Sequence, residues 1–316
     1  MTKKEAEIAL SKARLVMQQG VQYKMYSTFQ RSKSRGGYGI EISYVSADIK
    51  RLIVPKFVTR IGYGAGELAV GLEELIINTD EIDIADKAFY RSGLKKVHIN
   101  AKECTIGNSA FALNMLLDEV EISGNTIGIN ESAFRYCNIK CARLPNGLKY
   151  MDSFVFANND GMERLMLPDS LCNRDAVLFP DDLVGLCENN GKLSEVKLSK
   201  GITAIGMAMF SGCNSLDDIE LHEGLKRIDK FAFEDCSIRR IVIPSTVEYM
   251  KMSAFHNSML EELVILSKDI DYSSIGEVIY GSTQYLKLIK APKIILDNIM
   301  IRGTDFKNRV KFEVLE

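Results

Sequence analysis

A short aliphatic motif recurs along the chain at a nearly constant interval, and this recurrence constrains the fold more than any other feature. The motif is L-x-x-Φ-x-Φ, where Φ is aliphatic and the first residue is Leu, Ile or Met. Most steps between copies are 22 or 23 residues, and the exceptions are 31 and 26 residues. Such a period is typical of repeat architectures, in which successive coils stack on one another. Eleven copies begin at Ile49, Leu72, Leu94, Leu117, Ile139, Met162, Leu193, Leu216, Ile238, Leu260 and Leu286.

A second anchor, I-x-x-x-A-F, begins twelve residues after the start of most copies and stays in register with the first motif. Several copies have drifted from this pattern, and one of them begins at Ile275 and ends at Tyr280. The agreement of two motifs over so many copies excludes chance similarity. The clearest copies end at Ala88-Phe89, Ala110-Phe111, Ala133-Phe134, Ala232-Phe233 and Ala254-Phe255.

The two halves of the repeat predict a coil with one strand. The last two aliphatic residues of L-x-x-Φ-x-Φ lie two positions apart, so both point to the same side of a β-strand. One copy cannot bury this face alone, whereas a stack of copies can. We therefore expect equivalent strands to pair as a parallel sheet, about 4.8 Å apart. The I-x-x-x-A-F half has helical or tight-turn spacing and closes the coil. Proline ends the strand in five copies, where no ladder donor is needed, at Pro55, Pro145, Pro168, Pro244 and Pro292.

The combined pattern L-x-x-V-x-I-P-x-x-V-x-x-I-x-x-x-A-F-x-x-C resembles the leucine-rich repeats of the BspA-like family. The copy from Ile238 to Met250, which leads into Ala254-Phe255, matches almost in full, and the resemblance covers residues 46–292. It implies an α/β repeat solenoid, a leucine-rich repeat with a parallel β-sheet of about eleven rungs. It also implies a mostly bacterial, non-enzymatic protein that binds other macromolecules. Many relatives are secreted or surface-anchored and adhere to host or neighbouring cells.

The segments before and after the repeats are predicted to cap the stack, because each end of a solenoid exposes an apolar edge. Residues 1–45 are expected to form a capping helix and a basic, glycine-rich loop at 31–39. Thr2-x-x-Glu5 is a capping box, and Gly20 stands where the helix would end. The apolar helical face comprises Ala6, Ala9, Leu10, Ala13, Val16 and Met17. Packing on the first rung is the simpler role for this helix, and docking of a partner is the alternative.

At the other end, residues 293–316 are predicted to form a β cap. Ile294–Leu296, Ile299–Ile301 and Val310–Leu315 alternate like short strands, and turn residues separate them. The basic loop at 31–39 has one aromatic residue and resembles segments that hold phosphate or single-stranded nucleic acid. Its three positive charges lack a supporting basic surface, which favours a solvated connector.

Charge and cysteine usage narrow the class of protein. The chain has 40 Lys and Arg against 42 Asp and Glu, a net charge of -2, so a nucleic-acid partner is not expected. No apolar stretch is long enough to span a bilayer, and the first residues lack the apolar core of a secretory signal. Seven cysteines without a C-x-x-C pair favour reduced thiols. We therefore expect a cytoplasmic location, with a secreted or surface location if the native N-terminus is longer.

No motif predicts catalysis, a cofactor or a metal. Gly62-Tyr63-Gly64-Ala65-Gly66 resembles a phosphate-binding glycine run, yet it occupies the I-G-x-x-A-F slot of a repeat. Cys137, Cys213 and Cys236 each follow the anchor Phe by three residues, where other copies have Asn or Ser. They are interpreted as buried ladder residues, because a small polar side chain there satisfies turn backbone groups. The three histidines, His98, His222 and His256, are interpreted as incidental surface or turn residues.

The outward positions of the strands carry an alternating charge. Taking the second, third and fifth positions of each L-x-x-Φ-x-Φ, the rung charges are +2, -2, +2, -3, +2, 0, 0, -3, +2, -2 and +2. Opposite charges on neighbouring rungs attract, and like charges repel. The pattern predicts ion pairs between rungs that maintain their register. It also argues against nucleic acid, which requires an unbroken positive track.

The alternation lapses at the Met162 and Leu193 rungs, next to an insertion within residues 169–190 where Cys187 replaces the anchor Phe. Insertions in solenoids often form the binding face, although a tolerated surface loop is the simpler interpretation. We expect partner contacts from Arg143, Arg164, Met166 and Lys197. The resulting hypothesis is a monomeric, non-catalytic module that binds a protein partner. The alternative is a surface or exported bacterial adhesin.

Overall fold

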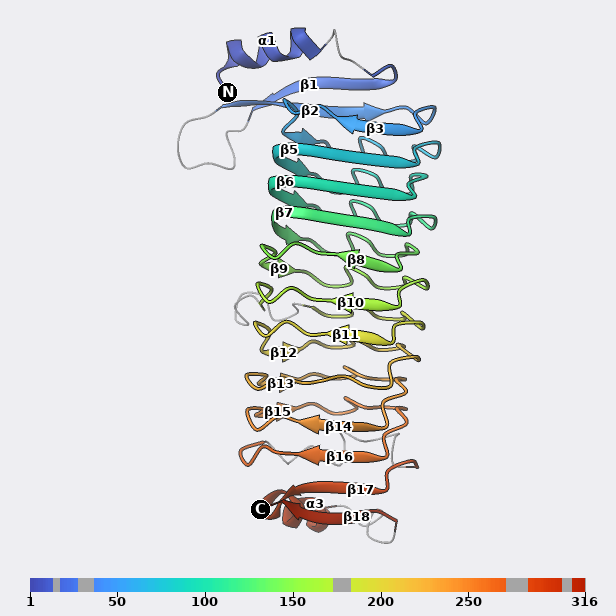
Figure 1. Ribbon diagram of the computed structural model, residues 1–316, viewed down its shortest axis with the longest axis vertical. Helices are drawn as coiled ribbons and strands as arrows, with labels where there is room; N and C mark the ends of the chain where they lie inside the picture. Colours follow the sequence, from blue (N-terminus) through green and yellow to red (C-terminus); the bar gives the residue numbers. More distant parts are fainter. Residues whose placement is uncertain (14–17, 28–36, 173–182, 271–283, 303–308, 316) are drawn as a thin grey trace. The chain divides into compact units, whose positions relative to one another are not determined.

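The chain forms two compact units, Met1–Lys149 and Tyr150–Glu316, and Figure 1 labels the elements of each. In both units a short parallel strand recurs once per copy of the repeat in most copies, so the predicted parallel β-solenoid is confirmed. The computed structural model describes residues 1–13, 18–27, 37–172, 183–270, 284–302 and 309–315, except for the side chains of residues 12, 13 and 298–302.

The first unit winds one sheet, in which the strand order is β1-β2-β4-β5-β6-β7-β8 and β3 lies beside β5. β1 and β2 are antiparallel, and the later strands are parallel. Three neighbouring strands, β5, β6 and β7, each run for 11 residues. The elements are α1 (Lys3–Ala13), β1 (Val21–Ser27), β2 (Tyr38–Val45), β3 (Arg51–Val54), β4 (Arg60–Ile61), β5 (Glu74–Ile84), β6 (Lys96–Ile106), β7 (Glu119–Ile129) and β8 (Cys141–Arg143).

The second unit carries shorter strands on two faces of its coils. β10 pairs with β11, β12-β13-β15 form a second group and β14-β16-β17-β18 a third, all parallel. The elements are β9 (Tyr150–Met151), β10 (Arg164–Met166), β11 (Glu195–Lys197), β12 (Ala204–Ile205), β13 (Arg227–Ile228), β14 (Arg240–Ile243), β15 (Tyr249–Met250), β16 (Glu262–Ile265), β17 (Leu288–Pro292), α3 (Lys293–Arg302) and β18 (Lys311–Leu315).

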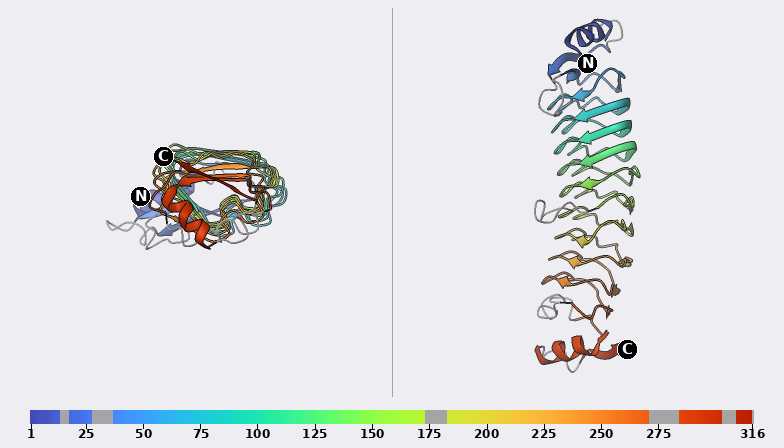
Figure 2. Two further views of the ribbon diagram at one scale, coloured as in Figure 1. Left: turned by 90° about the horizontal axis from the view of Figure 1, so that it is seen from below. Right: turned by 90° about the vertical axis from the view of Figure 1, so that its left-hand side faces the viewer.

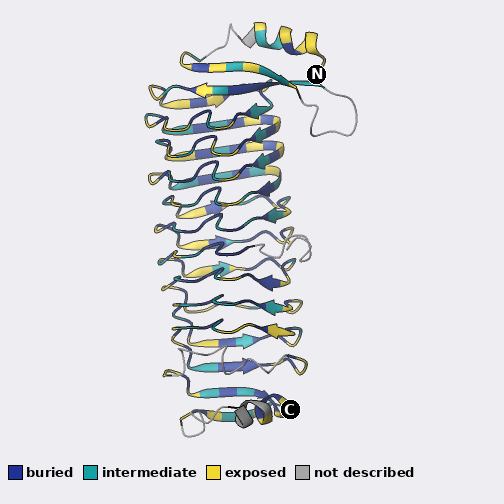
Figure 3. Ribbon diagram, turned by 180° about the vertical axis from the view of Figure 1, so that it is seen from behind, coloured by how far each residue is buried: buried dark blue, intermediate teal, exposed yellow. Residues whose placement is uncertain are grey.

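The register of the sheet reproduces the register of the sequence repeat. The fourth motif position pairs with itself from rung to rung, as in Leu75 with Val97 and Val97 with Val120. These side chains are buried, whereas the flanking positions are exposed or half-buried. Figure 3 shows this alternation as bands along the strands. The aliphatic pairs therefore form the inner face, as the two-residue spacing predicts.

The I-x-x-x-A-F half of each described coil consists of turns rather than a helix, which resolves the two alternatives left by its spacing. Two positions per coil have positive φ, as at Lys87 (56°) and Arg91 (53°). A positive φ is unfavourable for residues other than Gly. Here the strain is offset because Lys87 N–H donates to Asn108 O at 2.9 Å and Arg91 N–H donates to Ala112 O at 2.9 Å, both in the next coil.

The anchor phenylalanines form stacked columns inside each unit. In the first unit the Phe89 and Phe111 centroids are 5.5 Å apart, and those of Phe111 and Phe134 are 5.1 Å apart. All three rings are fully buried. Offset-stacked aromatic pairs stabilise a core beyond the area they bury. The second unit has an equivalent column of Phe210, Phe233 and Phe255.

Proline ends strands as the sequence predicts. β3 ends at Val54, and Val58 N–H then donates to Pro55 O at 2.9 Å, closing a tight turn. The same i+3 hydrogen bond to the proline carbonyl forms at Pro145, Pro168 and Pro244. Proline has no N–H to give to the ladder, so the coil bends there instead of extending.

The N-terminal segment contains a predicted helix and an unpredicted hairpin. In the capping box of α1, Thr2 N–H donates to Glu5 Oε2 at 2.8 Å and Glu5 N–H donates to Thr2 Oγ1 at 3.3 Å. Residues 14–17, which include Val16 and Met17, and residues 31–36 of the expected basic loop lie outside the described residues. Instead of a loop to residue 39, β2 begins at Tyr38 and pairs with β1, and α1 lies against this hairpin (Figure 2).

The C-terminal segment corrects one prediction. Ile294–Leu296 and Ile299–Ile301 were expected to be strands, but both lie in the helix α3. Ile295 and Leu296 are consecutive and both buried, which a helix allows and an alternating strand does not. Short apolar runs do not distinguish the two structures by periodicity alone. The strand expected at Val310–Leu315 is confirmed as β18, which pairs with β17.

The aromatic column predicts the cost of truncating its middle ring. Phe111→Ala removes the ring that stacks on both neighbours, so we expect a loss of about 3–5 kcal/mol in the free energy of unfolding. Denaturant unfolding followed by circular dichroism measures this loss. Met115→Ala, at an exposed site two residues beyond the same turn, is the control and should change stability by less than about 0.5 kcal/mol. Equal effects at the two positions would contradict a stabilising column.

Candidate functional site

The outward strand positions of the first unit are joined by ion pairs between neighbouring rungs. Arg51 Nε lies 2.7 Å from Glu74 Oε2, and Lys95 Nζ lies 3.0 Å from Glu73 Oε2. Lys96 Nζ lies 2.8 Å from Glu119 Oε2. Each pair joins residues of adjacent rungs. The ion pairing predicted from the alternating charges is therefore present here.

The second unit continues this pattern at its C-terminal end. Glu261 lies 3.0 Å from Arg239 on one side and 2.6 Å from Lys287 on the other. Glu262 is held in the same way by Arg240 and Lys290, at 3.5 and 3.3 Å. The ion pairs between rungs therefore neutralise much of the charge on the strand face of each unit.

The ion pairs shift the acidity of the groups they join. A hydrogen bond from Lys96 holds the pKa of the Glu119 carboxyl below its ordinary value, and the same contact raises the pKa of Lys96. Lys287 lowers the pKa of Glu261 in the same way. These side chains are largely exposed, so water and salt screen them and each pair contributes little to stability.

The strand ladder lapses at one described rung of the second unit. Residues 217–221 form no strand, and no described neighbour joins them by a ladder hydrogen bond. This rung carries Asp217, Asp218 and Glu220, three like charges that repel one another. The Leu117 rung also carries three carboxylates but forms β7, and there Lys96 and Arg143 of the flanking rungs pair with Glu119 and Glu121.

The four predicted contact residues do not form a single described site. Arg164 and Met166 lie on β10 and Lys197 on β11, where Met166 and Lys197 are register partners. Arg143 lies on β8 of the first unit, 3.9 Å from Glu121. Arg164 is paired with Glu195 at 3.6 Å. Lys197 makes no ion pair with any described residue. Residues 173–182 of the predicted insertion lie outside the described residues.

The ladder interpretation of the cysteines is confirmed. The Cys137 thiol donates to Phe111 O at 3.3 Å, and Cys236 donates to Phe210 O at 3.2 Å. Asn114 fills the same position in another coil, where its Nδ2 donates to Phe89 O and Phe111 O at 2.9 and 2.7 Å. Burial raises the pKa of the Cys137 and Cys213 thiols to about 12, so neither provides a thiolate near neutral pH. Cys187 occupies the anchor position and is fully buried.

One histidine takes part in an arrangement that resembles catalytic machinery. Ser211 Oγ–H donates to Glu234 Oε2 at 3.0 Å, and His256 Nδ1 lies 2.9 Å from Glu234 Oε1. In a Ser-His-carboxylate triad the imidazole lies between the hydroxyl and the carboxylate. Here the carboxylate lies in the middle, so the imidazole cannot take the serine proton directly. His256 is therefore an inter-rung ligand of Glu234 rather than an incidental turn residue.

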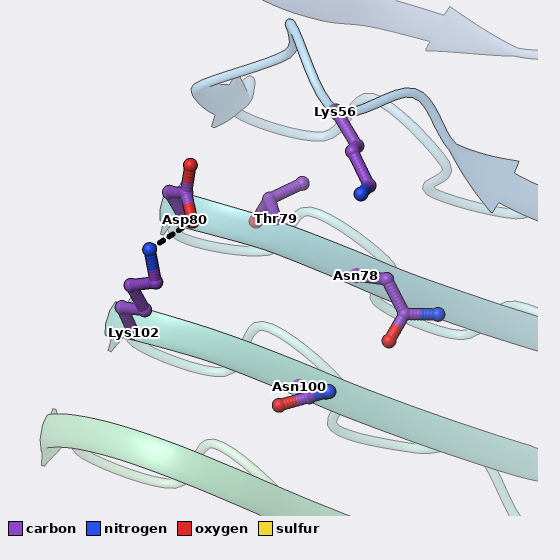
Figure 4. A pocket seen from close by; sticks show the side chains of 6 residues that line it. All are labelled: Lys56, Asn78, Thr79, Asp80, Asn100 and Lys102. Atoms are coloured by element: carbon purple, nitrogen blue, oxygen red, sulfur yellow. Dashed lines mark ion pairs between the residues drawn. The ribbon is translucent and has the colours of Figure 1, made fainter.

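A pocket that the sequence analysis missed lies at a corner of the first unit. It has a volume of about 500 Å³ and is lined by Lys56, Asn78, Thr79, Asp80, Asn100 and Lys102 (Figure 4). A signal for it existed in the sequence. Proline follows the strand in the copies at Ile49 and Ile139, but the three copies between them have Asn78, Asn100 and Ser123 there. In these three copies, which lack the proline, the strands β5, β6 and β7 extend through the corner.

No described group of three or more His, Cys, Asp or Glu side chains is arranged to hold a metal ion. No helix within the described ranges is long and apolar enough to cross a membrane.

A family model and several solved structures resemble the chain. The model for the BspA type leucine-rich repeat region, with six copies, matches residues 41–171 and 185–309. A leucine-rich repeat protein from Bacteroides ovatus is 19% identical, with 94% of this chain and 91% of that chain covered and a TM-score of 0.46. The pneumococcal vaccine antigen PcpA is 15% identical, with 95% and 98% covered and a TM-score of 0.43. The T. pallidum leucine-rich repeat protein is 14% identical, with 95% and 99% covered and a TM-score of 0.43. No curated protein matches the chain.

The ion pairs predict a salt-dependent loss of stability on neutralisation. The double variant Glu73→Gln, Glu74→Gln removes the pairs with Lys95 and Arg51, so we expect the free energy of unfolding to fall by about 0.5–2 kcal/mol at low salt. Added salt should reduce the difference from the unmodified protein, because it screens exposed charges. Denaturant unfolding at two salt concentrations measures both effects.

A matched control for this variant is Asp217→Asn, Asp218→Asn. It changes the net charge by the same amount, but neither aspartate forms an ion pair with a described residue. It should leave stability unchanged or raise it, because it removes no ion pair and reduces the repulsion among the carboxylates of that rung. A loss equal to that of the glutamate variant would mean that net charge, rather than pairing, determines stability.

The pKa of Glu119 provides a test of a single pair. Lys96→Met should raise this pKa toward the ordinary value of 4.5, as carbon-13 NMR titration of the carboxyl group would show. Because folding lowers the pKa, the pair stabilises the fold above that ordinary value and loses its effect as pH falls through the folded-state pKa. Lys287→Met is the control, since it should raise the pKa of Glu261 and leave that of Glu119 unchanged. An unchanged Glu119 pKa in the first variant would contradict the pairing.

Proposed function

The chain belongs to the BspA-type leucine-rich repeat family, and from this premise we propose that it is a non-catalytic module that binds another protein. The exposed strand face of the second unit is the proposed surface. The observation that carries the proposal is that Lys197 on β11 and the three carboxylates of the next rung, Asp217, Asp218 and Glu220, form no ion pair with a described residue. Charged rungs elsewhere on this face hold one another, and a partner that covered them would have to desolvate existing pairs.

Lys197 and Met166 form a site that a partner can bury at a lower cost in desolvation free energy. Lys197 lacks an ion pair with a described residue, and its register partner Met166 is half-buried. A polarizable, adaptable methionine next to an unpaired ammonium suits a partner with an apolar group beside a carboxylate. Arg164 stands two positions before Met166 on the same strand, and it remains a proposed contact at the edge of this surface, where it is paired with Glu195. Arg143 remains a proposed contact of the first unit.

The adjoining rung gives the surface an asymmetric charge. Asp217, Asp218 and Glu220 are exposed and form no ion pair with a described residue. A partner that places an acidic group on Lys197 and a basic group on this rung would be oriented by both. Electrostatic complementarity of this kind determines register and specificity more than affinity.

The two candidate roles of this module differ in where the protein is located. We propose an intracellular, monomeric protein. The intracellular location is supported by Cys141, an exposed cysteine that forms no disulfide, because exposed thiols persist mainly in reducing compartments. The alternative is a surface or exported adhesin, whose partner would lie on host or neighbouring cells.

A photoreactive residue at position 166 tests the surface and the location together. We expect the Met166→benzoylphenylalanine protein to crosslink one partner in cytoplasmic extract of the source cells, and Lys197→Glu in the same protein to reduce the yield at least about tenfold, equivalent to 1.4 kcal/mol. Mass spectrometry identifies the product and gel densitometry measures its yield. Size-exclusion chromatography of the unmodified protein should show a monomer.

The control places the same residue at Val242, which has the matching strand position on β14 and the same half-buried state. Crosslinks at 242 that equal those at 166 would mean that the lapse does not define the binding surface. Crosslinks formed only on the outside of intact host or neighbouring cells would replace the intracellular role with the adhesin role.

A further inference from the structure

The corner pocket of the first unit exists because two neighbouring coils turn differently. β3 and β5 pair up to Val54 and Ile77, and pairing resumes only where β4 meets β5 at Arg60 and Asp83. Between these points the first coil makes the Pro55 turn, while β5 continues extended through Asn78, Thr79 and Asp80. The two backbones therefore separate at the corner, and the space between them is the pocket.

The pocket contains polar groups that lack partners within the described structure. Thr79 is only 7% exposed, yet its Oγ1 has no hydrogen-bond partner. A buried hydroxyl without a partner is costly and calls for an explanation, such as a ligand. Asn78 and Asn100 are register partners on β5 and β6 and are both exposed (Figure 4). Their carboxamides form no hydrogen bond with a described residue.

The charges of the pocket leave one cation available. Lys102 Nζ lies 2.8 Å from Asp80 Oδ1, so these two groups neutralise each other. Lys56 projects from the turn toward β5 in Figure 4 and has no ion pair with a described residue. The site as a whole therefore carries one net positive charge, and it lies on Lys56.

These groups together distinguish between classes of ligand. Each carboxamide has both donors and an acceptor, and the Thr79 hydroxyl is both donor and acceptor. A phosphate near neutral pH has mostly acceptor oxygens and at most two O–H donors, so it would leave part of the amide oxygens unused and would place its negative charge near the Asp80 carboxylate. Sugar hydroxyl groups donate and accept, and they match all of these groups. The pocket lining includes no aromatic ring on which a neutral sugar could stack.

We propose that this pocket binds an acidic monosaccharide unit, with its carboxylate on Lys56 and its hydroxyl groups on Asn78 and Asn100 and, after a rotation of the buried side chain toward the pocket, on Thr79. The volume of about 500 Å³ lies within the usual range for small-molecule sites. The site belongs to the first unit and does not depend on the protein-binding surface of the second. It adds a ligand class to the molecule whether or not that surface binds a protein.

Titration of the nitrogen-15-labelled protein tests the proposal. We expect glucuronate, galacturonate or N-acetylneuraminate to shift the amide resonances of Asn78, Thr79 and Asn100, with a Kd of order 1 mM or tighter for at least one of them. Glucose and inorganic phosphate should shift them at least about tenfold more weakly, a difference of 1.4 kcal/mol. No shift with any acidic sugar would overturn the proposal, and equal binding of phosphate would reduce the pocket to a simple anion site.

Three variants identify the groups responsible. Lys56→Met should weaken acidic-sugar binding about tenfold by removing the cation, and Thr79→Val, which keeps the branched shape, should weaken it several-fold by removing the hydroxyl. Lys95→Met removes a lysine of the same sheet that does not line the pocket and should leave binding unchanged. Equal losses in Lys56→Met and Lys95→Met would indicate attraction by overall charge and contradict the site. Thermal unfolding of each variant shows whether it is folded.

Discussion

The structure depends on the inability of a single coil to bury its own interior. Each coil supplies one short inner strand face and one anchor ring, and neither is covered until the next coil stacks upon it. The Phe89, Phe111 and Phe134 rings illustrate this dependence, since the middle ring is covered on both faces by rings one repeat away. The same stacking supplies hydrogen-bond partners for the turns. Left-handed residues such as Lys87 are tolerated because the next coil accepts their N–H groups.

Because the interior holds the coils together, the outward residues can vary. Their charges then affect whether neighbouring strands pair. The Leu117 and Leu216 rungs each carry three carboxylates, yet only the first forms a regular strand. Their ion pairing differs, because Lys96 and Arg143 pair with the glutamates of the first, whereas the carboxylates of the second form no ion pair with a described residue. Aliphatic residues thus establish that a coil stacks, while the charges of adjacent rungs influence whether its outer strand joins the ladder. A partner binds at a lower free-energy cost on a surface whose charges are unpaired than on one whose charges already form ion pairs.

The sequence predicts most of the repeat region, because every feature there is tested many times along one chain. The strand register, the proline turns, the inter-rung ion pairs and the positions of Cys137 and Cys236 all follow from the period. The ends were harder, since each occurs once. Ile294–Leu296 formed a helix rather than a strand because a short apolar run fits both, and the hairpin of β1 and β2 has no counterpart in the repeats. The contact of His256 with Glu234 could not be predicted from the repeat, because it joins side chains of two coils at positions that do not recur as this pair elsewhere.

The corner pocket shows why a regular fold acquires sites at its irregularities. A perfect repeat would place the same turn at the same corner of every coil, and identical turns would pack without a gap. Pro55 in one coil and Asn78 in the next impose different backbone paths on adjacent corners, since one residue ends the ladder and the other continues it. The gap borders Thr79, which is buried and whose inward position is taken by Ala101 in the following coil. A hydroxyl at an inward position is unfavourable for packing alone, and the proposed ligand would give it a partner beside the lysine and the two amides of the pocket.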